Sequence, residues 1–143
     1  MPVPLVLIIE DSVPDAELAR AAILSLDSPI EVITAASASA GLAQLARFPG
    51  DPDHSPVLVW LDMNLPEVTG LEIIKRIRSS PETATIPIVA FSGSEQMQTV
   101  RSALEAGANI YVHKPDDVDL YMRRVGRVTE AFLEHALSPS LNS

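Results

Sequence analysis

The sequence predicts a doubly wound α/β fold with five parallel strands and five helices. Two observations lead to this prediction. Five short apolar runs, most of them rich in Val and Ile, recur along the 143 residues, and each is followed by a stretch whose apolar residues repeat every three to four positions. Strands that alternate with helices in this way form a parallel sheet with helices on both faces.

The central strand is predicted at residues 57–61, an unbroken apolar run of the kind that is buried on both faces of a sheet. It ends at Asp62. Leu65-Pro66 then predicts an extended or turned backbone, because Pro lacks an N–H and restricts the residue before it. We expect Gly70 to allow the bend into the next helix.

The remaining elements rest on similar signals. Ser12 and Pro14 predict the start of a helix after the first strand, Ser37 or Ser39 the start of the second, and Gly107 the end of the fourth. The other strands are predicted at residues 5–9, 30–34, 86–91 and 109–112. Residues 48–56 are rich in Pro and Asp and predict a long surface loop. We expect a domain over residues 1–137 and a frayed tail at 138–143.

The composition and charge of the chain exclude several classes of function. The formal net charge is -9 and the pI about 4.6, which argues against nucleic-acid and anionic-membrane binding because both require a basic surface. The lack of Cys excludes disulfides, thiolate catalysis and thiolate-bound metals. The N-terminus lacks the basic segment of a signal peptide, and no run approaches the roughly 20 apolar residues of a membrane span. We therefore expect a cytoplasmic protein.

Polar residues follow four of the predicted strands: Glu10-Asp11, Asp62, Ser92 and Lys114. With the flavodoxin-like strand order 2-1-3-4-5, the ends of the first and third strands flank the point where ligands bind. Three carboxylates gathered there repel one another unless a cation is present. Oxygen ligands favour a hard ion, and Mg²⁺ fits best because it takes one or two carboxylates and keeps several waters. A solvated acidic rim is the alternative interpretation.

Lys114 could form a plain ion pair with these acids or serve as a point charge for phosphate. A carboxylate can attack a phosphoryl donor to form an aspartyl phosphate, which nearby positive charge stabilises. Mg²⁺, Lys114 and the Ser92 hydroxyl around Asp62 suit that chemistry. The Lys114-Pro115 bond is a candidate cis peptide, since about one X–Pro bond in twenty in folded proteins is cis.

The chain resembles the receiver domains of two-component response regulators from about residue 5 to residue 133. One such motif would be weak, whereas five in order along the strands are specific. The motifs are Glu10-Asp11, the segment from Leu61 through Asp62, Met63, Asn64 and Leu65 to Pro66 with Gly70, then Ser92, Tyr111 and Lys114-Pro115.

The resemblance implies that Asp62 accepts the phosphoryl group and binds Mg²⁺ together with Asp11. Glu10 would act on the ion through a water, and Asn64 would supply its backbone carbonyl. Asn64 also occupies a position that tunes phosphate lifetime in this family.

The resemblance also implies a switch. Ser92 would donate a hydrogen bond to the phosphoryl group, and Lys114 would pair with it. Tyr111 would be the aromatic residue that turns inward on activation, although a Tyr on a strand is also a common core residue.

We therefore expect a response regulator that accepts a phosphoryl group from a histidine kinase on Asp62 and switches an interaction surface. It would not be an enzyme beyond Mg²⁺-dependent self-phosphorylation and self-dephosphorylation. One alternative is an interaction module that works without phosphorylation. Another is a haloacid-dehalogenase-type phosphatase, which requires a second acid where this chain has Asn64.

The long loop, the extended last helix and the lack of an output domain resemble stand-alone regulators of bacteriophytochrome-type histidine kinases. The last helix, residues 118–137, is predicted to face the sheet through Tyr121, Val125, Val128 and Phe132. An uncovered apolar row would then remain, which predicts a homodimer through this helix. The row consists of Met122, Thr129, Leu133 and Leu137.

Overall fold

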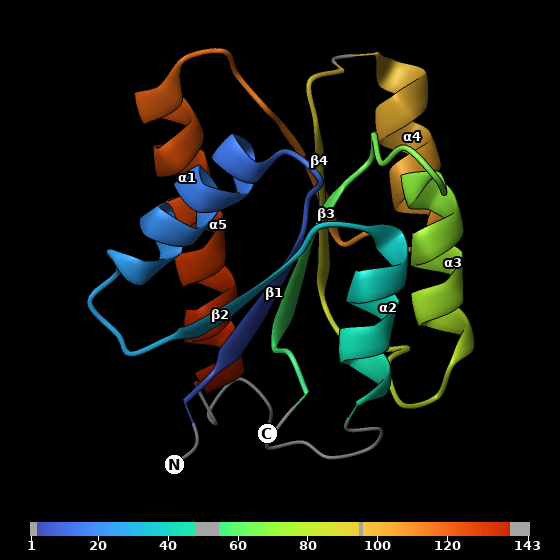
Figure 1. Ribbon diagram of the computed structural model, residues 1–143, viewed down its shortest axis with the longest axis horizontal. Coiled ribbons are helices and arrows are strands. Elements are labelled where there is room, and N and C mark those ends of the chain that lie inside the picture. The colour runs from blue at the N-terminus through green and yellow to red at the C-terminus, as the bar shows by residue number, and fades with distance from the viewer. Residues whose placement is uncertain (1–2, 48–54, 95, 138–143) are drawn as a thin grey trace.

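The computed structural model describes residues 3–47, 55–94 and 96–137. In this part of the chain five strands form one parallel sheet in the predicted order β2-β1-β3-β4-β5 (Figure 1). The strands are β1 (Leu5–Ile9), β2 (Glu31–Ala35), β3 (Leu58–Asp62), β4 (Ile88–Ser92) and β5 (Ile110–His113). The helices are α1 (Val13–Leu24), α2 (Ala38–Ala46), α3 (Gly70–Ser79), α4 (Met97–Ala106) and α5 (Val118–Leu137). Most of the predicted loop at 48–56, and the predicted tail at 138–143, fall outside the described residues.

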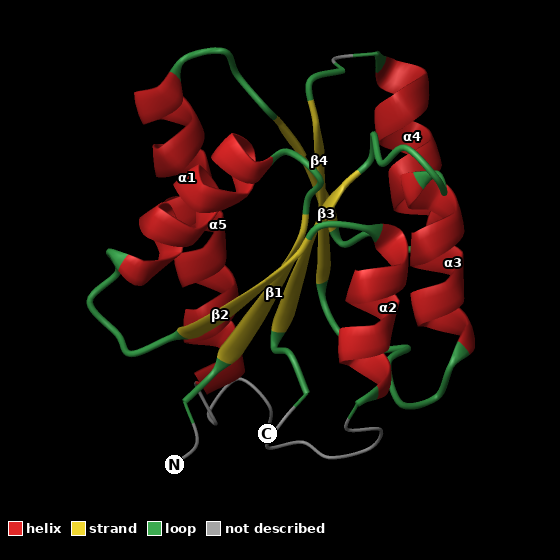
Figure 2. Ribbon diagram, in the orientation of Figure 1, coloured by secondary structure: helices red, strands yellow, loops and turns green. Residues whose placement is uncertain are grey.

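Helices cover both faces of the sheet. α1 and α5 lie on one face, and α2, α3 and α4 lie on the other (Figures 1 and 2). Crossovers between parallel strands are right-handed, so the step from β1 outward to β2 places α1 on one face. The three later steps run in the opposite direction and place α2, α3 and α4 on the other face.

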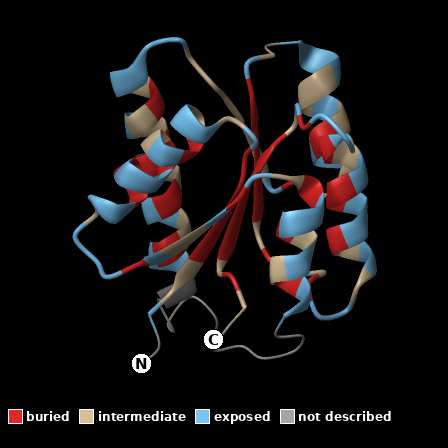
Figure 3. Ribbon diagram, viewed as in Figure 1, coloured by how far each residue is buried: buried red, intermediate tan, exposed pale blue. Residues whose placement is uncertain are grey.

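The central strands form the core. Every residue of β3 and β4 is buried, as the unbroken apolar runs predict (Figure 3). Side chains of a strand alternate between faces. Ile9 therefore packs beneath α2 and α3, whereas Ile8 packs beneath α1 and α5. Trp60 is fully buried in this second layer, with its ring edge-on to Phe91 at 5.5 Å between centroids.

Helix ends follow the predicted capping residues. Ser12 precedes α1 and its Oγ accepts a hydrogen bond from the Asp15 N–H. Ser37 caps α2 in the same way. Gly107 ends α4 with a φ of 125°, a conformation that residues with a side chain rarely adopt.

Gly70 is needed for a different reason from the one predicted. The bend into α3 is made by Thr69, whose side chain caps the helix. A Cβ on Gly70 would lie 2.8 Å from the Cα of Met63. The missing side chain therefore lets α3 approach the backbone directly after Asp62.

The cis peptide predicted at Lys114-Pro115 is wrong, because no cis bond occurs in the described ranges. The Lys114 N–H bonds to the Ser92 carbonyl at 2.7 Å, one residue beyond the paired residues Ser92 and His113 of β4 and β5.

The buried face of α5 is rotated by about one residue from the predicted one. After Tyr121 and Val125, the next buried positions are Thr129 and Leu133, whereas Val128 and Phe132 are half-buried. The Trp60 indole N–H donates to the Thr129 hydroxyl at 3.0 Å and holds the helix in this orientation. The prediction that Thr129 and Leu133 lie on an uncovered face is therefore wrong, and Met122 is half-buried.

Within the described ranges, none of the helices combines the length and the apolar character needed to cross a lipid bilayer.

Candidate functional site

Three acids meet at the carboxyl edge of the sheet, as the sequence predicts. Carboxylate oxygens of Glu10, Asp11 and Asp62 lie within 4.8 Å of one another. Glu10 and Asp62 are 2% and 4% exposed, whereas Asp11 is exposed. The site therefore has two acids at its floor and one at its rim.

Strand pairing brings these acids together. β1 and β3 are neighbours, and Ile9 lies opposite Leu61, so the next residues, Glu10 and Asp62, end side by side. Local hydrogen bonds orient both side chains. Glu10 Oε1 accepts from the Ser12 N–H at 2.9 Å, and Asp62 Oδ1 accepts from the Asn64 N–H at 2.9 Å.

Lys114, directly after β5, reaches across this edge. Its Nζ lies 2.8 Å from Glu10 Oε2, 3.0 Å from Asp15 Oδ2 and 3.8 Å from Asp62 Oδ2. The same ammonium lies 4.9 Å from the centre of the Phe91 ring. Burial alone would lower the pKa of Lys114, but the hydrogen bonds to Glu10 and Asp15 and the charge of Asp62 hold it above its usual value. The site thus keeps a fixed positive charge beside Asp62.

Glu10 sits in an environment that disfavours its charge. Burial and, next, the neighbouring Asp62 raise the pKa of Glu10 to about 7, against the opposing effect of Lys114. A carboxylate with this environment gains from a nearby cation. An all-oxygen donor set that includes an exposed acid also suits a hard, partly hydrated ion. The three acids therefore fit a divalent cation such as Mg²⁺.

The other side of Asp62 carries the predicted switch residues. Ser92, at the end of β4, is buried, and its Oγ accepts from Asn64 Nδ2 at 3.0 Å and from the Ser94 N–H at 3.1 Å. Tyr111 is half-buried, and its ring packs against the core beneath α2, α3 and α4. Its hydroxyl donates to the Ser94 carbonyl at 2.7 Å. Hydrogen bonds through Ser94, in the loop after β4, therefore link the Ser92 hydroxyl to the Tyr111 hydroxyl.

Asp15 is the contact that the sequence analysis missed. It lies in the first turn of α1, where an acid has an ordinary explanation in the helix dipole. No local pattern marks its contact with Lys114, because the sequence shows only an acid three residues after the capping residue Ser12.

A sheet of order 2-1-3-4-5 with clustered acids, a lysine and a hydroxyl at its switch point defines the receiver class of signalling domain. Residues 6–125 match the response regulator receiver domain family, and the chain belongs to that family.

Two proteins illustrate the range of relatives. The chain is 27% identical over 141 residues to the response regulator Rcp1 of Synechocystis sp., covering 97% of this chain and 95% of Rcp1. It is 35% identical over 136 residues to a protein-glutamate methylesterase/protein-glutamine glutaminase of Nocardioides sp., covering 93% of this chain but only 35% of that enzyme. The chain thus spans about a third of the methylesterase.

Solved structures agree with these relatives. The phosphorylated cyanobacterial phytochrome response regulator RcpA superposes with a TM-score of 0.83 at 27% identity, over 92% of this chain and 94% of RcpA. The Mn²⁺-bound form of Rcp1 superposes with a TM-score of 0.81 at 25% identity, over 92% of this chain and 95% of Rcp1.

Proposed function

We propose that this chain is a response regulator whose receiver domain, residues 1–137, accepts a phosphoryl group on Asp62 from a histidine kinase. The observation that carries the proposal is the position of the Asp62 carboxylate at the end of the central strand, with Lys114 Nζ at 3.8 Å and two further acids beside it. A plain acidic rim would not require a lysine held by hydrogen bonds among the acids.

The chemistry follows from these positions. An Asp62 oxygen attacks the phosphorus of the donor, and the phosphorus–nitrogen bond breaks with its electron pair passing to the leaving imidazole. Lys114 supplies positive charge to the phosphoryl oxygens. Glu10, Asp11, Asp62 and the backbone carbonyl of Asn64 would hold Mg²⁺. When bound, this ion neutralises negative charge on the transferred group.

Phosphate on Asp62 changes the bonding of Ser92. The Ser92 hydroxyl moves to donate to a phosphoryl oxygen, and its loop moves with it. The Ser94 carbonyl, which accepts the hydrogen bond from the Tyr111 hydroxyl, moves with this loop. The bond then breaks and Tyr111 turns inward. A Lys114→Ala variant should still be phosphorylated but should not move Tyr111, as NMR of the Tyr ring signals would measure.

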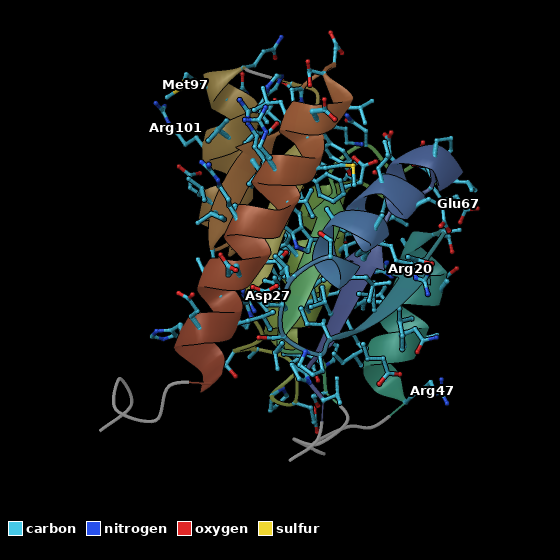
Figure 4. All side chains as sticks on the ribbon, turned by 90° about the vertical axis from the view of Figure 1, so that its left-hand side faces the viewer. Arg20, Asp27, Arg47, Glu67, Met97 and Arg101 are labelled. Atoms are coloured by element: carbon cyan, nitrogen blue, oxygen red, sulfur yellow. The ribbon has the colours of Figure 1, made fainter. Side chains whose placement is uncertain are left out.

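Phosphorylation with a small donor tests the assignment of Asp62. Wild-type protein incubated with phosphoramidate and Mg²⁺ should gain one phosphoryl group by intact mass spectrometry, and Asp62→Asn should gain none. Asp27→Asn is the matched control, because Asp27 is exposed in the turn between α1 and β2, whereas Asp62 is at the carboxyl end of β3. Figure 4 shows Asp27 lower in the molecule than Glu67, which lies in the loop after β3. Equal labelling of Asp62→Asn would contradict the proposal.

The same experiment distinguishes other functions. A phosphatase would turn over many phosphoesters continuously, whereas a phosphorylation-independent interaction module would not react at all. A stable phosphoprotein that forms once per chain supports the receiver function.

The proposed kinase partner is of the phytochrome type. The support is the similarity to RcpA, named as a phytochrome response regulator, over nearly the whole of both chains. Purified phytochrome-type histidine kinase, autophosphorylated and mixed with this chain, should transfer its phosphoryl group within seconds. A kinase of another sensor type that transfers faster under the same conditions would contradict this partner.

The protein is also proposed to form a homodimer through α5, by a surface shifted from the predicted row. Val128 and Phe132 are half-buried, and Ala131 beside them is exposed. Ala131→Glu should weaken a dimer in analytical ultracentrifugation, whereas Ala21→Glu, at an exposed alanine of α1, should not. A monomer at tens of micromolar with and without phosphorylation would contradict the homodimer.

A further inference from the structure

Lys114 is held on the α1 side of the site. Its two short contacts are with Glu10 and Asp15, at 2.8 and 3.0 Å, whereas Asp62 Oδ2 lies at 3.8 Å, beyond hydrogen-bonding range. An ammonium group has three N–H donors, and two of them are used by these acids. The charge proposed to serve a phosphoryl group on Asp62 is therefore engaged elsewhere before that group arrives.

The backbone of Asp15 is fixed in place. Its N–H donates to the Ser12 hydroxyl at 3.4 Å, and its carbonyl accepts from the Tyr121 hydroxyl at 3.3 Å. Tyr121 belongs to the first turn of α5 and is itself buried. The Asp15 carboxylate is thus presented to Lys114 from α1 and is not part of the cluster of three acids.

We propose that Asp15 is a positioning residue that holds Lys114 back from Asp62 and so weakens the hold of the site on a phosphoryl group. This inference rests on the proposed function of Asp62. It adds a regulatory role for α1, because a stronger contact between Asp15 and Lys114 leaves the lysine less available to bind the phosphoryl oxygens on Asp62.

Two physical effects act in the same direction. Asp15 and a phosphoryl group compete for the same ammonium, so the Asp15 contact lowers the charge that Lys114 offers to the phosphoryl oxygens. The Asp15 carboxylate also repels the negative charge that the phosphoryl group brings. Its side chain is 34% exposed, and solvent screens both effects, so the expected change is moderate.

Beryllium fluoride, which binds a carboxylate as a stand-in for a phosphoryl group, measures this effect at equilibrium. Isothermal titration calorimetry in saturating Mg²⁺ should give about three- to fivefold tighter binding to Asp15→Asn than to wild type, the scale of one partly exposed ion pair. Asp15→Glu keeps the acid and should restore affinity close to that of wild type. If Asp15 only stabilised the first turn of α1, Asp15→Asn would bind beryllium fluoride more weakly than wild type. Asp15→Glu, whose side chain is one methylene group longer, would then not restore the affinity.

Glu17→Gln provides the matched control. Glu17 is an exposed acid on the same helix, and the substitution removes the same charge. Its affinity for beryllium fluoride should stay close to that of wild type.

Three outcomes overturn the inference: unchanged or weaker binding to Asp15→Asn, equal tightening in Glu17→Gln, or failure of Asp15→Glu to restore affinity. Failure of the proposed function is distinguishable. In that case wild-type protein would bind no beryllium fluoride, or Asp62→Asn would bind it equally well.

Discussion

The hydrogen bond between Trp60 and Thr129 gives a sharp test of how α5 is attached to the sheet. Both residues are 0% exposed, and the indole N–H has Thr129 Oγ1 as its acceptor at 3.0 Å. Thr129→Val removes this acceptor at nearly constant volume. A buried donor left without a partner costs about 1–3 kcal/mol of unfolding free energy. For a domain of this size that corresponds to a fall in Tm of roughly 2–12 °C.

Chemical denaturation followed by circular dichroism measures this loss. Thr34→Val, the same substitution at an exposed position of β2, should change the unfolding free energy by no more than about 0.5 kcal/mol. In a Trp60→Phe background no indole N–H remains, so Thr129→Val should cost clearly less there than in wild type. The reasoning is refuted if Thr129→Val costs no more than Thr34→Val, or costs the same in both backgrounds.

Three further predictions concern the site. Asp11→Asn should weaken Mg²⁺ binding at least about tenfold, the scale on which loss of even an outer-shell partner affects metal sites, as calorimetry would measure; unchanged affinity would contradict the metal site. Without divalent metal, the contribution of Glu10 should lower the unfolding free energy as pH rises from about 4.5 to about 7, because folded Glu10 keeps its proton to a higher pH than the unfolded chain does. Denaturation at several pH values should show a weaker dependence of the unfolding free energy on pH for Glu10→Gln than for wild type. An unchanged slope would contradict this contribution of Glu10. Gly70→Ala should cost about 1–3 kcal/mol by overpacking against Met63, and it should slow phosphorylation of Asp62 in mass spectrometry; a neutral variant would show that α3 can shift freely.

The layered architecture was readable from local patterns. Residues 57–61 form an unbroken apolar run, which is typical of a strand covered on both faces, and β3 is buried throughout. Alternation of such runs with helices leaves few possible topologies, because crossovers are right-handed. The capping residues Ser12 and Gly107 were readable for the same reason, since each acts on its own helix end.

The acid cluster was also predictable, because it depends on strand ends. Glu10 and Asp62 each follow an apolar run, and parallel strands bring their carboxyl ends to one edge. The identity of each acid was therefore available in the sequence, together with the presence of Lys114 at the same edge.

The orientation of α5 depended on packing between distant segments. Apolar residues recur at both the three- and the four-residue spacing along this helix, so periodicity alone allows either Val128 or Thr129 to face inward. A threonine looks like a surface residue until its partner is known. The buried indole of Trp60, 69 residues away, supplies that partner and favours Thr129.

The Asp15–Lys114 contact has the same origin. The two residues are 99 positions apart, and an acid in the first turn of a helix carries no local mark of its partner. Helix propensity and periodicity depend on the neighbours of a residue along the chain. The ion pairs of a long side chain such as Lys114 depend on acids that come within reach only when the chain folds. Local patterns therefore predict where the charges gather, and the packed structure determines which of them pair.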